Sequence, residues 1–146
     1  MTLMDGNVVE GIGIFPSRSV RTIERASTEC FGFDDAGNLT TGYANHSSDI
    51  ELLEGAEPLI ELREGFGNSS RHKSKQRSDE GLVFGNLMAA RLNGPLLPLN
   101  PHLADRFLEM VTKRSRVSYQ QDSEFARAAD SFAMKAREEL RQRLER

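Results

Sequence analysis

The sequence has 146 residues and a net charge of −3, with 38% hydrophobic residues, one cysteine and no tryptophan. That length suits a modest hydrophobic core, and we expect a single domain over residues 1–146. The negative charge is not that of a protein whose whole surface binds polyanions, and the single Cys30 excludes a disulfide within the chain.

The N-terminal residues predict no export signal. The first residues, MTLMDGNVVEG, lack a basic segment followed by an apolar one, so no signal peptide is predicted. No apolar run approaches the roughly 20 residues that are needed to cross a bilayer. We therefore expect a protein that is not secreted, that makes no membrane contact and that resides in the cytoplasm.

The first part of the chain, residues 7–66, predicts a small antiparallel sheet. Residues 7–15, NVVEGIGIF, favour a strand, whereas residues 17–29 fit a helix or a strand and stay open. Residues 30–43 indicate a hairpin, because CFGF alternates, DDAGN supplies turn residues and LTTGY resumes the strand pattern. Two more short strands are expected around residues 51–53 and 59–62.

A change in composition follows the predicted sheet. The stretch GFGNSSRHKSKQRSD, residues 65–79, has no aliphatic residue, four serines and four Lys or Arg. It predicts a flexible basic loop, residues 67–79, between the sheet and a helical part.

The remaining residues, 80–146, predict three helices. The first, over residues 80–92, is apolar on more than one side and is ended by Asn93-Gly94-Pro95. The second begins at Asn100-Pro101, a capping residue followed by proline at the first helical position. The third runs from Ser123 to the C-terminus, with Asp122 or Ser123 as its cap. The expected fold class is α+β, with an antiparallel sheet followed by a three-helix C-terminal part.

The third helix carries the clearest pattern in the chain. Apolar residues three and four apart form one stripe along it, namely Phe125, Ala129, Phe132, Ala136, Leu140 and Leu144. A stripe of this kind needs a covering surface, either the rest of the chain or a neighbouring molecule. We favour a neighbour, and the stripe is our candidate helix interface.

No residue pattern specifies a reaction, a metal or a cofactor. His46, His72 and His102 have no second His or Cys at a ligand spacing, which is typical of surface histidines. The run His46-Ser47-Ser48-Asp49 predicts a polar turn, because catalytic triads are assembled by tertiary structure and not by adjacency. The Asp34–Asn38 stretch lacks the ligand order of a calcium loop. We therefore expect no cofactor and no enzymatic activity.

Basic residues gather in two places. They are Arg71, Lys73, Lys75 and Arg77 in the loop, and Lys113, Arg114 and Arg116 near the end of the second helix. Two interpretations remain open: a solvated surface, or an ionic contact with nucleic acid or an acidic partner. No aromatic platform for base stacking lies beside them in the sequence.

Residues 79–117 resemble the middle of the phage head-to-tail adaptor proteins of the P22 type, also called packaged-DNA stabilisation proteins. The matching residues are EGLVFGNLMAARLNGP and NPHLADRFLEMVTKRSRV, a helix, a short loop and a second amphipathic helix with basic residues. The resemblance implies a non-enzymatic assembly subunit in an oligomeric ring, with portal or tail proteins as partners and a place in the virion.

Two other functions stay open beside that resemblance. One is a small nucleic-acid-binding accessory or regulatory protein that acts through the basic loop. The other is a dimeric interaction or chaperone-like protein that pairs through its helices.

Overall fold

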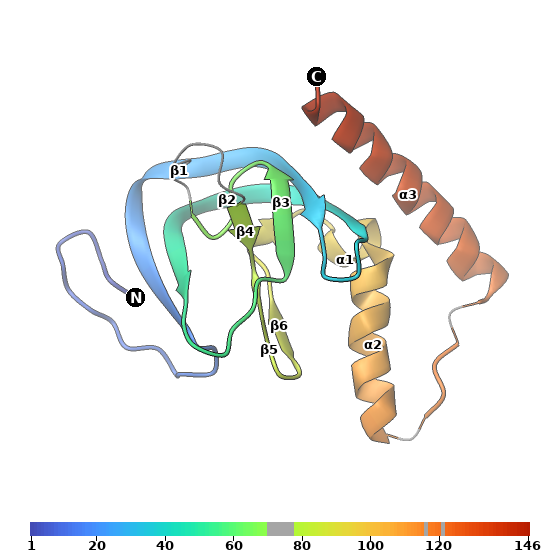
Figure 1. Ribbon diagram of the computed structural model, residues 1–146, viewed down its shortest axis with the longest axis horizontal. Coiled ribbons are helices and arrows are strands. Elements are labelled where there is room, and N and C mark those ends of the chain that lie inside the picture. The colour runs from blue at the N-terminus through green and yellow to red at the C-terminus, as the bar shows by residue number, and fades with distance from the viewer. Residues whose placement is uncertain (70–77, 116, 121) are drawn as a thin grey trace.

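The computed structural model describes residues 1–69, 78–115, 117–120 and 122–146. Figure 1 shows the strands gathered at one end of the long axis and the two long helices at the other. The N-terminal segment lies at the sheet end, and the C-terminus ends the last helix.

Two long antiparallel strands, β1 (Ser17–Phe33) and β2 (Leu39–Leu52), form the centre of the main sheet. The sheet has the order β4-β3-β1-β2-β7, and all of its pairings are antiparallel. Its other strands are β3 (Ile60–Glu64), β4 (Ser78–Glu80) and β7 (Leu92–Asn93). A separate hairpin pairs β5 (Leu82–Phe84) with β6 (Leu87–Ala89).

The register of β1 against β2 contains a bulge. Arg21 lies opposite Ser48 and Ala26 lies opposite His46, so β1 advances farther than β2 between the two pairs. The extra residues of β1 leave the ladder, and the side chain of Ile23 among them is 86% exposed. Residues 17–29, for which helix and strand had both been open, thus belong to a bulged strand.

The turn between β1 and β2 confirms the hairpin predicted over residues 30–43. Asp34 Oδ1 accepts hydrogen bonds from the backbone N–H groups of Ala36 and Asn38 at 3.1 and 2.7 Å. Asp34 Oδ2 accepts a third from Asn38 Nδ2 at 3.0 Å. The aspartate therefore fixes the turn by satisfying its backbone donors.

The helices are α1 (Leu96–Leu99), α2 (Pro101–Ser115) and α3 (Glu124–Leu144). The start of α2 at Pro101 is as predicted, and Ser123 caps α3 by accepting a hydrogen bond from the Ala126 N–H at 3.1 Å. Helix α3 contacts α1, β1 and β2. An antiparallel sheet followed by three helices confirms the α+β class.

The buried core lies between the sheet and the first two helices. Its members come from β1, β2, β3, β7 and α2 and from the residue before β3: Ala26, Cys30, Ala44, Leu59, Ile60, Leu62, Leu92 and Leu103. Half-buried Phe66, Val83, Met88, Ala90 and Leu96 pack against this cluster.

The helix predicted over residues 80–92 is wrong, because these residues form β5, β6 and parts of β4 and β7. Gly85 has a φ of +57° and, with Asn86, makes the two-residue connection of the β5–β6 hairpin. At Gly81 a Cβ would lie 2.4 Å from the carbonyl oxygen of Ala89. The short apolar runs on either side of this Gly-Asn connection have the length of strands, and the helical part begins at Leu96.

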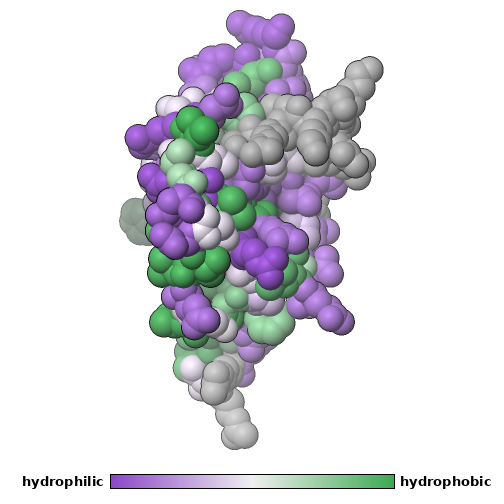
Figure 2. All heavy atoms as spheres, turned by 90° about the vertical axis from the view of Figure 1, so that its left-hand side faces the viewer, coloured by the Kyte–Doolittle hydropathy of each residue, from purple (hydrophilic) through white to green (hydrophobic). Residues whose placement is uncertain are grey.

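The strand predicted over residues 7–15 is also wrong. Val8 makes a single bridge to Thr2, and the rest of the stretch pairs with no strand. Its apolar side chains lack a covering layer, and Ile12 is 90% exposed. Figure 2 faces this end of the molecule and shows apolar side chains at the surface among polar ones.

The predicted loop over residues 67–79 is described only at its two ends. Asn68 is buried, and its amide exchanges two hydrogen bonds with the backbone of Gly81, at 2.8 and 3.1 Å. Strand β4 begins at Ser78. Residues 70–77, which include Arg71, Lys73, Lys75 and Arg77, lie outside the described residues.

Candidate functional site

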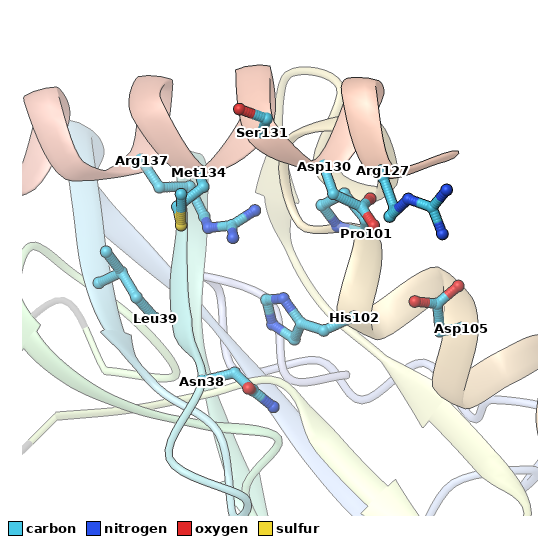
Figure 3. Close-up of a pocket in the computed structure, with 10 residues that line it drawn as sticks. All are labelled: Asn38, Leu39, Pro101, His102, Asp105, Arg127, Asp130, Ser131, Met134 and Arg137. Carbon is cyan, nitrogen blue, oxygen red and sulfur yellow. The ribbon is translucent and has the colours of Figure 1, made fainter. Parts of the chain in front are cut away.

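A polar pocket lies where α2 and α3 meet the β1–β2 hairpin, and Figure 3 shows its walls. The cavity has a volume of about 430 Å³. It is lined by Asn38, Leu39, Pro101, His102, Asp105, Arg127, Asp130, Ser131, Met134 and Arg137. Half of these residues carry ionisable side chains, so the pocket is suited to a polar ligand.

His102 lies at the centre of the polar lining, in the first turn of α2. Its Nε2 atom shares a hydrogen bond of 2.9 Å with the Thr40 hydroxyl and lies 3.8 Å from Asp34 Oδ2. Burial lowers the pKa of His102, and the carboxylate of Asp34 opposes that shift. The imidazole is therefore neutral near pH 7 and can accept a proton.

Asn100 fixes the position of this histidine against the sheet. It is fully buried, and its Oδ1 accepts a hydrogen bond from the Thr41 N–H at 2.9 Å. Its Nδ2 donates to the carbonyl oxygens of Thr41 and Leu96, both at 2.8 Å. The side-chain amide thus pairs with the backbone N–H and C=O groups of Thr41, as the backbone of a neighbouring strand would. These two bonds connect the start of α2 to β2.

Helix α3 supplies charged groups to the other wall, and α2 adds Asp105. Arg137 Nη1 donates to the Leu99 carbonyl oxygen at 2.6 Å, and burial lowers the pKa of this guanidinium. Asp105 Oδ1 accepts a hydrogen bond of 2.7 Å from the Tyr119 hydroxyl. Asp130 lies on the α3 side of the cavity (Figure 3). The two carboxylates and the guanidinium groups of Arg127 and Arg137 around one cavity match a small ligand that carries both charges.

A second polar cluster is buried between β2, β4 and the residue before β7. Glu80 is fully buried, its Oε1 accepts a hydrogen bond from the Arg91 N–H at 2.6 Å, and burial raises its pKa. The Arg91 guanidinium donates to the carbonyl oxygens of Ser48 and Gly67 at 2.5 and 2.6 Å. These bonds hold β2 against the segment after β3, which is a structural task.

The run from His46 to Asp49 is part of β2, so the predicted polar turn there is wrong. Burial lowers the pKa of His46, and the nearby Arg91 adds to that effect. Ser48 meets Arg91 through both its carbonyl oxygen and its hydroxyl. The side chain of Ser48 therefore lies beside the half-buried Arg91.

Cys30 is a buried thiol without the surroundings of a nucleophile. Its side chain is fully buried, and its Sγ lies 3.5 Å from the Phe66 carbonyl oxygen. Burial raises the pKa of Cys30, which keeps the sulfur protonated at neutral pH.

The candidate helix interface predicted on α3 is only partly covered. Phe125 and Phe132 are 89% and 73% exposed, whereas Ala133 is the buried residue of this helix. Leu140 and Leu144 are half-buried, and Ala129 and Ala136 are exposed. The side of α3 that meets the rest of the chain is therefore offset from the stripe, whose role as an interface stays a prediction.

The second predicted basic group is only partly described. Lys113 lies on α2 and pairs with Glu109 at 4.0 Å, and Arg114 belongs to the same helix. Arg116 lies outside the described residues. A contact of these residues with a partner stays a prediction.

The pocket around His102 had no signal in the sequence. His102 had been predicted as a surface histidine, but its side chain is only 17% exposed. Its partner Thr40 is 62 positions away in the chain. Within the described part of the chain, no group of three or more His, Cys, Asp and Glu side chains is arranged to hold a metal ion. No helix there combines the length and the apolarity needed to cross a membrane.

Comparison with known proteins points to a bacterial enzyme subunit. The chain is 27% identical over 116 residues to the lipid II isoglutaminyl synthase (glutamine-hydrolysing) subunit GatD of Staphylococcus aureus (strain N315), a match that covers 80% of this chain and 45% of that protein. It is 24% identical over 139 residues to the subunit of the same name from Streptococcus pneumoniae (strain ATCC BAA-255 / R6), covering 92% of this chain and 49% of that protein. No protein-family model matches the chain.

The chain thus spans about half the length of the curated relatives that it matches. The single domain expected over residues 1–146 therefore stays a prediction. The pneumococcal match covers 92% of this chain. It therefore includes the span from Asp34 to Asp130, wherever its ends lie. Most of the pocket therefore lies in the part of the chain that resembles these subunits.

These similarities overturn the predicted phage function. Both relatives are named as subunits of a glutamine-hydrolysing synthase, so the phage adaptor, the virion location and the absence of an enzymatic role are wrong. The nucleic-acid-binding accessory and the chaperone-like dimer are set aside by the same finding. The adaptor resemblance also required a helix over residues 80–92, where the structure has strands. The relatives are subunits by name, which fits the expectation of protein partners but not of portal or tail proteins.

Proposed function

We propose that the chain acts in the glutamine-dependent amidation of a lipid-linked cell-wall precursor, as part of a glutamine-hydrolysing subunit. The observation that carries this proposal is the match to two relatives of the same name, one of which extends over 92% of the chain. Glutamine hydrolysis releases ammonia. In an isoglutaminyl product a carboxyl group has been converted to an amide, and ammonia is the source of the amide nitrogen.

The state of Cys30 limits what the chain contributes to that chemistry. Hydrolysis of an amide through a covalent intermediate needs an activated nucleophile. Cys30 is fully buried and its pKa is raised, and it is the only cysteine in the sequence. We therefore assign the nucleophile to the half of the relatives that this chain does not match, and to this chain the task of completing the subunit around it.

The polar pocket supports a role in ligand binding within the same function. Glutamine carries an ammonium and a carboxylate group, and the pocket offers Asp105 and Asp130 together with Arg137. The neutral imidazole of His102 can exchange a proton with a ligand that reaches it. A titration of glutamine against the chain, followed by amide and imidazole NMR shifts, tests this role. Shifts confined to the pocket support it, and an unchanged spectrum at millimolar glutamine refutes it.

The amidation itself is tested in the source organism. Deletion of the gene is expected to lower the fraction of muropeptides that carry isoglutamine, as measured by liquid chromatography and mass spectrometry. Complementation with the wild type and with Cys30→Ser should restore that fraction equally, since Cys30 is not the nucleophile. An unchanged muropeptide profile after deletion would overturn the proposed function. Rescue by the wild type but not by Cys30→Ser would indicate that Cys30 of this chain is the nucleophile.

A further inference from the structure

An apolar groove lies between the β5–β6 hairpin and the helices α1 and α2, on the side of α2 away from the polar pocket. In Figure 1 the hairpin and α2 run in the same direction, and the residues lining the groove come from both. Its volume is about 300 Å³. The lining contains no charged side chain and consists of Leu59, Asn86, Leu87, Met88, Ala89, Ala90, Leu96, Leu97, Leu103 and Phe107.

Large apolar side chains at this groove remain open to solvent. Leu87 is 40% exposed, Leu97 is 45% exposed and Phe107 is 50% exposed. On the same helix as Phe107, Leu108 and Val111 are 37% and 47% exposed. Exposed apolar side chains gathered at one groove are typical of a face that another polypeptide covers.

An open strand edge lies beside these side chains. Strand β6 belongs to a two-stranded sheet and pairs only with β5 in the described part of the chain. Its sequence, Leu87-Met88-Ala89, has no charge and no proline to discourage further pairing. The backbone of β6 and the groove next to it can therefore receive a peptide segment in extended form.

We infer that this groove binds the polypeptide that corresponds to the unmatched half of the curated relatives. In those relatives about as much chain lies outside the match as within it, and both halves belong to one subunit. This chain has an apolar groove and, within its described residues, a β6 edge that pairs with no further strand, and a second half would bury a surface of this kind. The occupant is thus a protein segment of that type, and not a second copy of this chain.

The inference rests on the relationship used for the proposed function, but it is tested by binding and not by amidation. The full 146-residue chain is coexpressed with the unmatched half of the Streptococcus pneumoniae relative. The molar mass of the purified material is then measured by light scattering after gel filtration. We expect one copy of each polypeptide in the complex. If no complex forms but amidation in cells is intact, the inferred binding at the groove is refuted and the proposed function is unaffected.

Variants in the groove locate the contact. Phe107→Asp and Leu97→Asp should each weaken the complex by about thirtyfold or more, as for buried apolar contacts at the centre of an interface. Phe132→Asp is the matched control, because it makes the same change on α3 at a side chain that is 73% exposed. Circular dichroism establishes that each variant is folded, and Leu97→Gln replaces any aspartate variant that is not.

The other outcomes overturn the inference. A complex that is unaffected by both groove variants would place the contact elsewhere. An equal loss with Phe132→Asp would place it on α3. Absence of any complex, or a homodimer of this chain that Phe107→Asp dissociates, would show that the unmatched half is not the occupant.

Discussion

Replacing Asn100 by alanine should destabilise the protein more than any other single change of a polar side chain outside the buried Glu80 cluster. Asn100 is fully buried between β2 and the helices, and its amide makes three hydrogen bonds. Two of them satisfy the N–H and C=O groups of Thr41, which is itself fully buried. The methyl group of alanine cannot make any of these hydrogen bonds.

The magnitude follows from the groups that lose their partners. A typical buried hydrogen bond contributes about 1 kcal/mol, and a buried backbone group left without a partner costs about 1–3 kcal/mol. With Thr41 losing both of its bonds to the amide, we expect Asn100→Ala to lower the free energy of unfolding by about 3–5 kcal/mol. Because domains are stable by only about 5–15 kcal/mol, a loss of that size is large.

Urea unfolding at pH 7, followed by circular dichroism, measures this loss. Asn93→Ala is the matched control, since Asn93 is exposed and its side chain makes one hydrogen bond of 3.2 Å to the Arg91 carbonyl oxygen. The control should change the free energy of unfolding by less than about 0.5 kcal/mol. Equal losses for the two variants, or a loss below about 1 kcal/mol for Asn100→Ala, would refute the assignment of Asn100 as the tie between α2 and β2.

Four further predictions concern the sheet, the buried groups and α3. Gly32→Ala should lower the free energy of unfolding by about 2–3 kcal/mol, because its Cβ would lie 2.2 Å from the Glu61 carbonyl oxygen. The control Gly11→Ala, which has open space around the new Cβ, should not lower it. Urea unfolding of both variants measures the difference. The raised pKa of Glu80 means that its contribution to stability is fully present below the ordinary value of 4.5 and is lost as the pH rises through the folded-state pKa. Glu80→Gln should therefore gain stability relative to the wild type between pH 4.5 and pH 8, and an unchanged difference between the two proteins would contradict this. Cys30 should react with a disulfide reagent only as fast as the protein unfolds, and rapid labelling of the native protein would contradict its burial. Phe132→Asp should leave the thermal midpoint of the isolated chain unchanged, since the side chain is 73% exposed, and a large drop would show that the stripe on α3 is core.

Short-range signals in the sequence predicted the ends of several elements correctly. The hairpin around Asp34 and the cap of α3 at Ser123 depend on bonds within a few residues, and the start of α2 follows from the helix-compatible backbone of Pro101. Such bonds form wherever the local sequence allows them, so the local sequence suffices to predict them.

The error over residues 80–92 has a different origin. A short apolar run satisfies the spacing of a helix and of a buried strand equally well, and only the Gly85-Asn86 pair distinguishes them. The same ambiguity made the adaptor resemblance look stronger than it was. What selects the strands is the pairing of β5 with β6 and of β7 with β2, which is not visible in the local pattern.

The pocket could not be predicted because its parts meet only in the folded chain. His102 comes from the start of a helix, whereas Thr40, 62 positions earlier, and Asp34 belong to the strand start and the turn of one hairpin. The α3 stripe was visible, but the direction that α3 turns toward the sheet is decided by Ala133 and by the bond from Arg137 to Leu99. These contacts follow from tertiary packing and not from helical periodicity.

Helix α2 connects the two surfaces on which the proposals rest. His102 and Asp105 line the polar pocket, whereas Leu103 and Phe107 line the apolar groove, and the two pairs lie on opposite faces of the same helix. Asn100 ties the start of that helix to β2. A polypeptide that covers the groove therefore contacts α2, the helix that carries His102. If the unmatched half of the relatives supplies the nucleophile, its docking on one side of α2 would fix the position of the ligand-binding groups on the other.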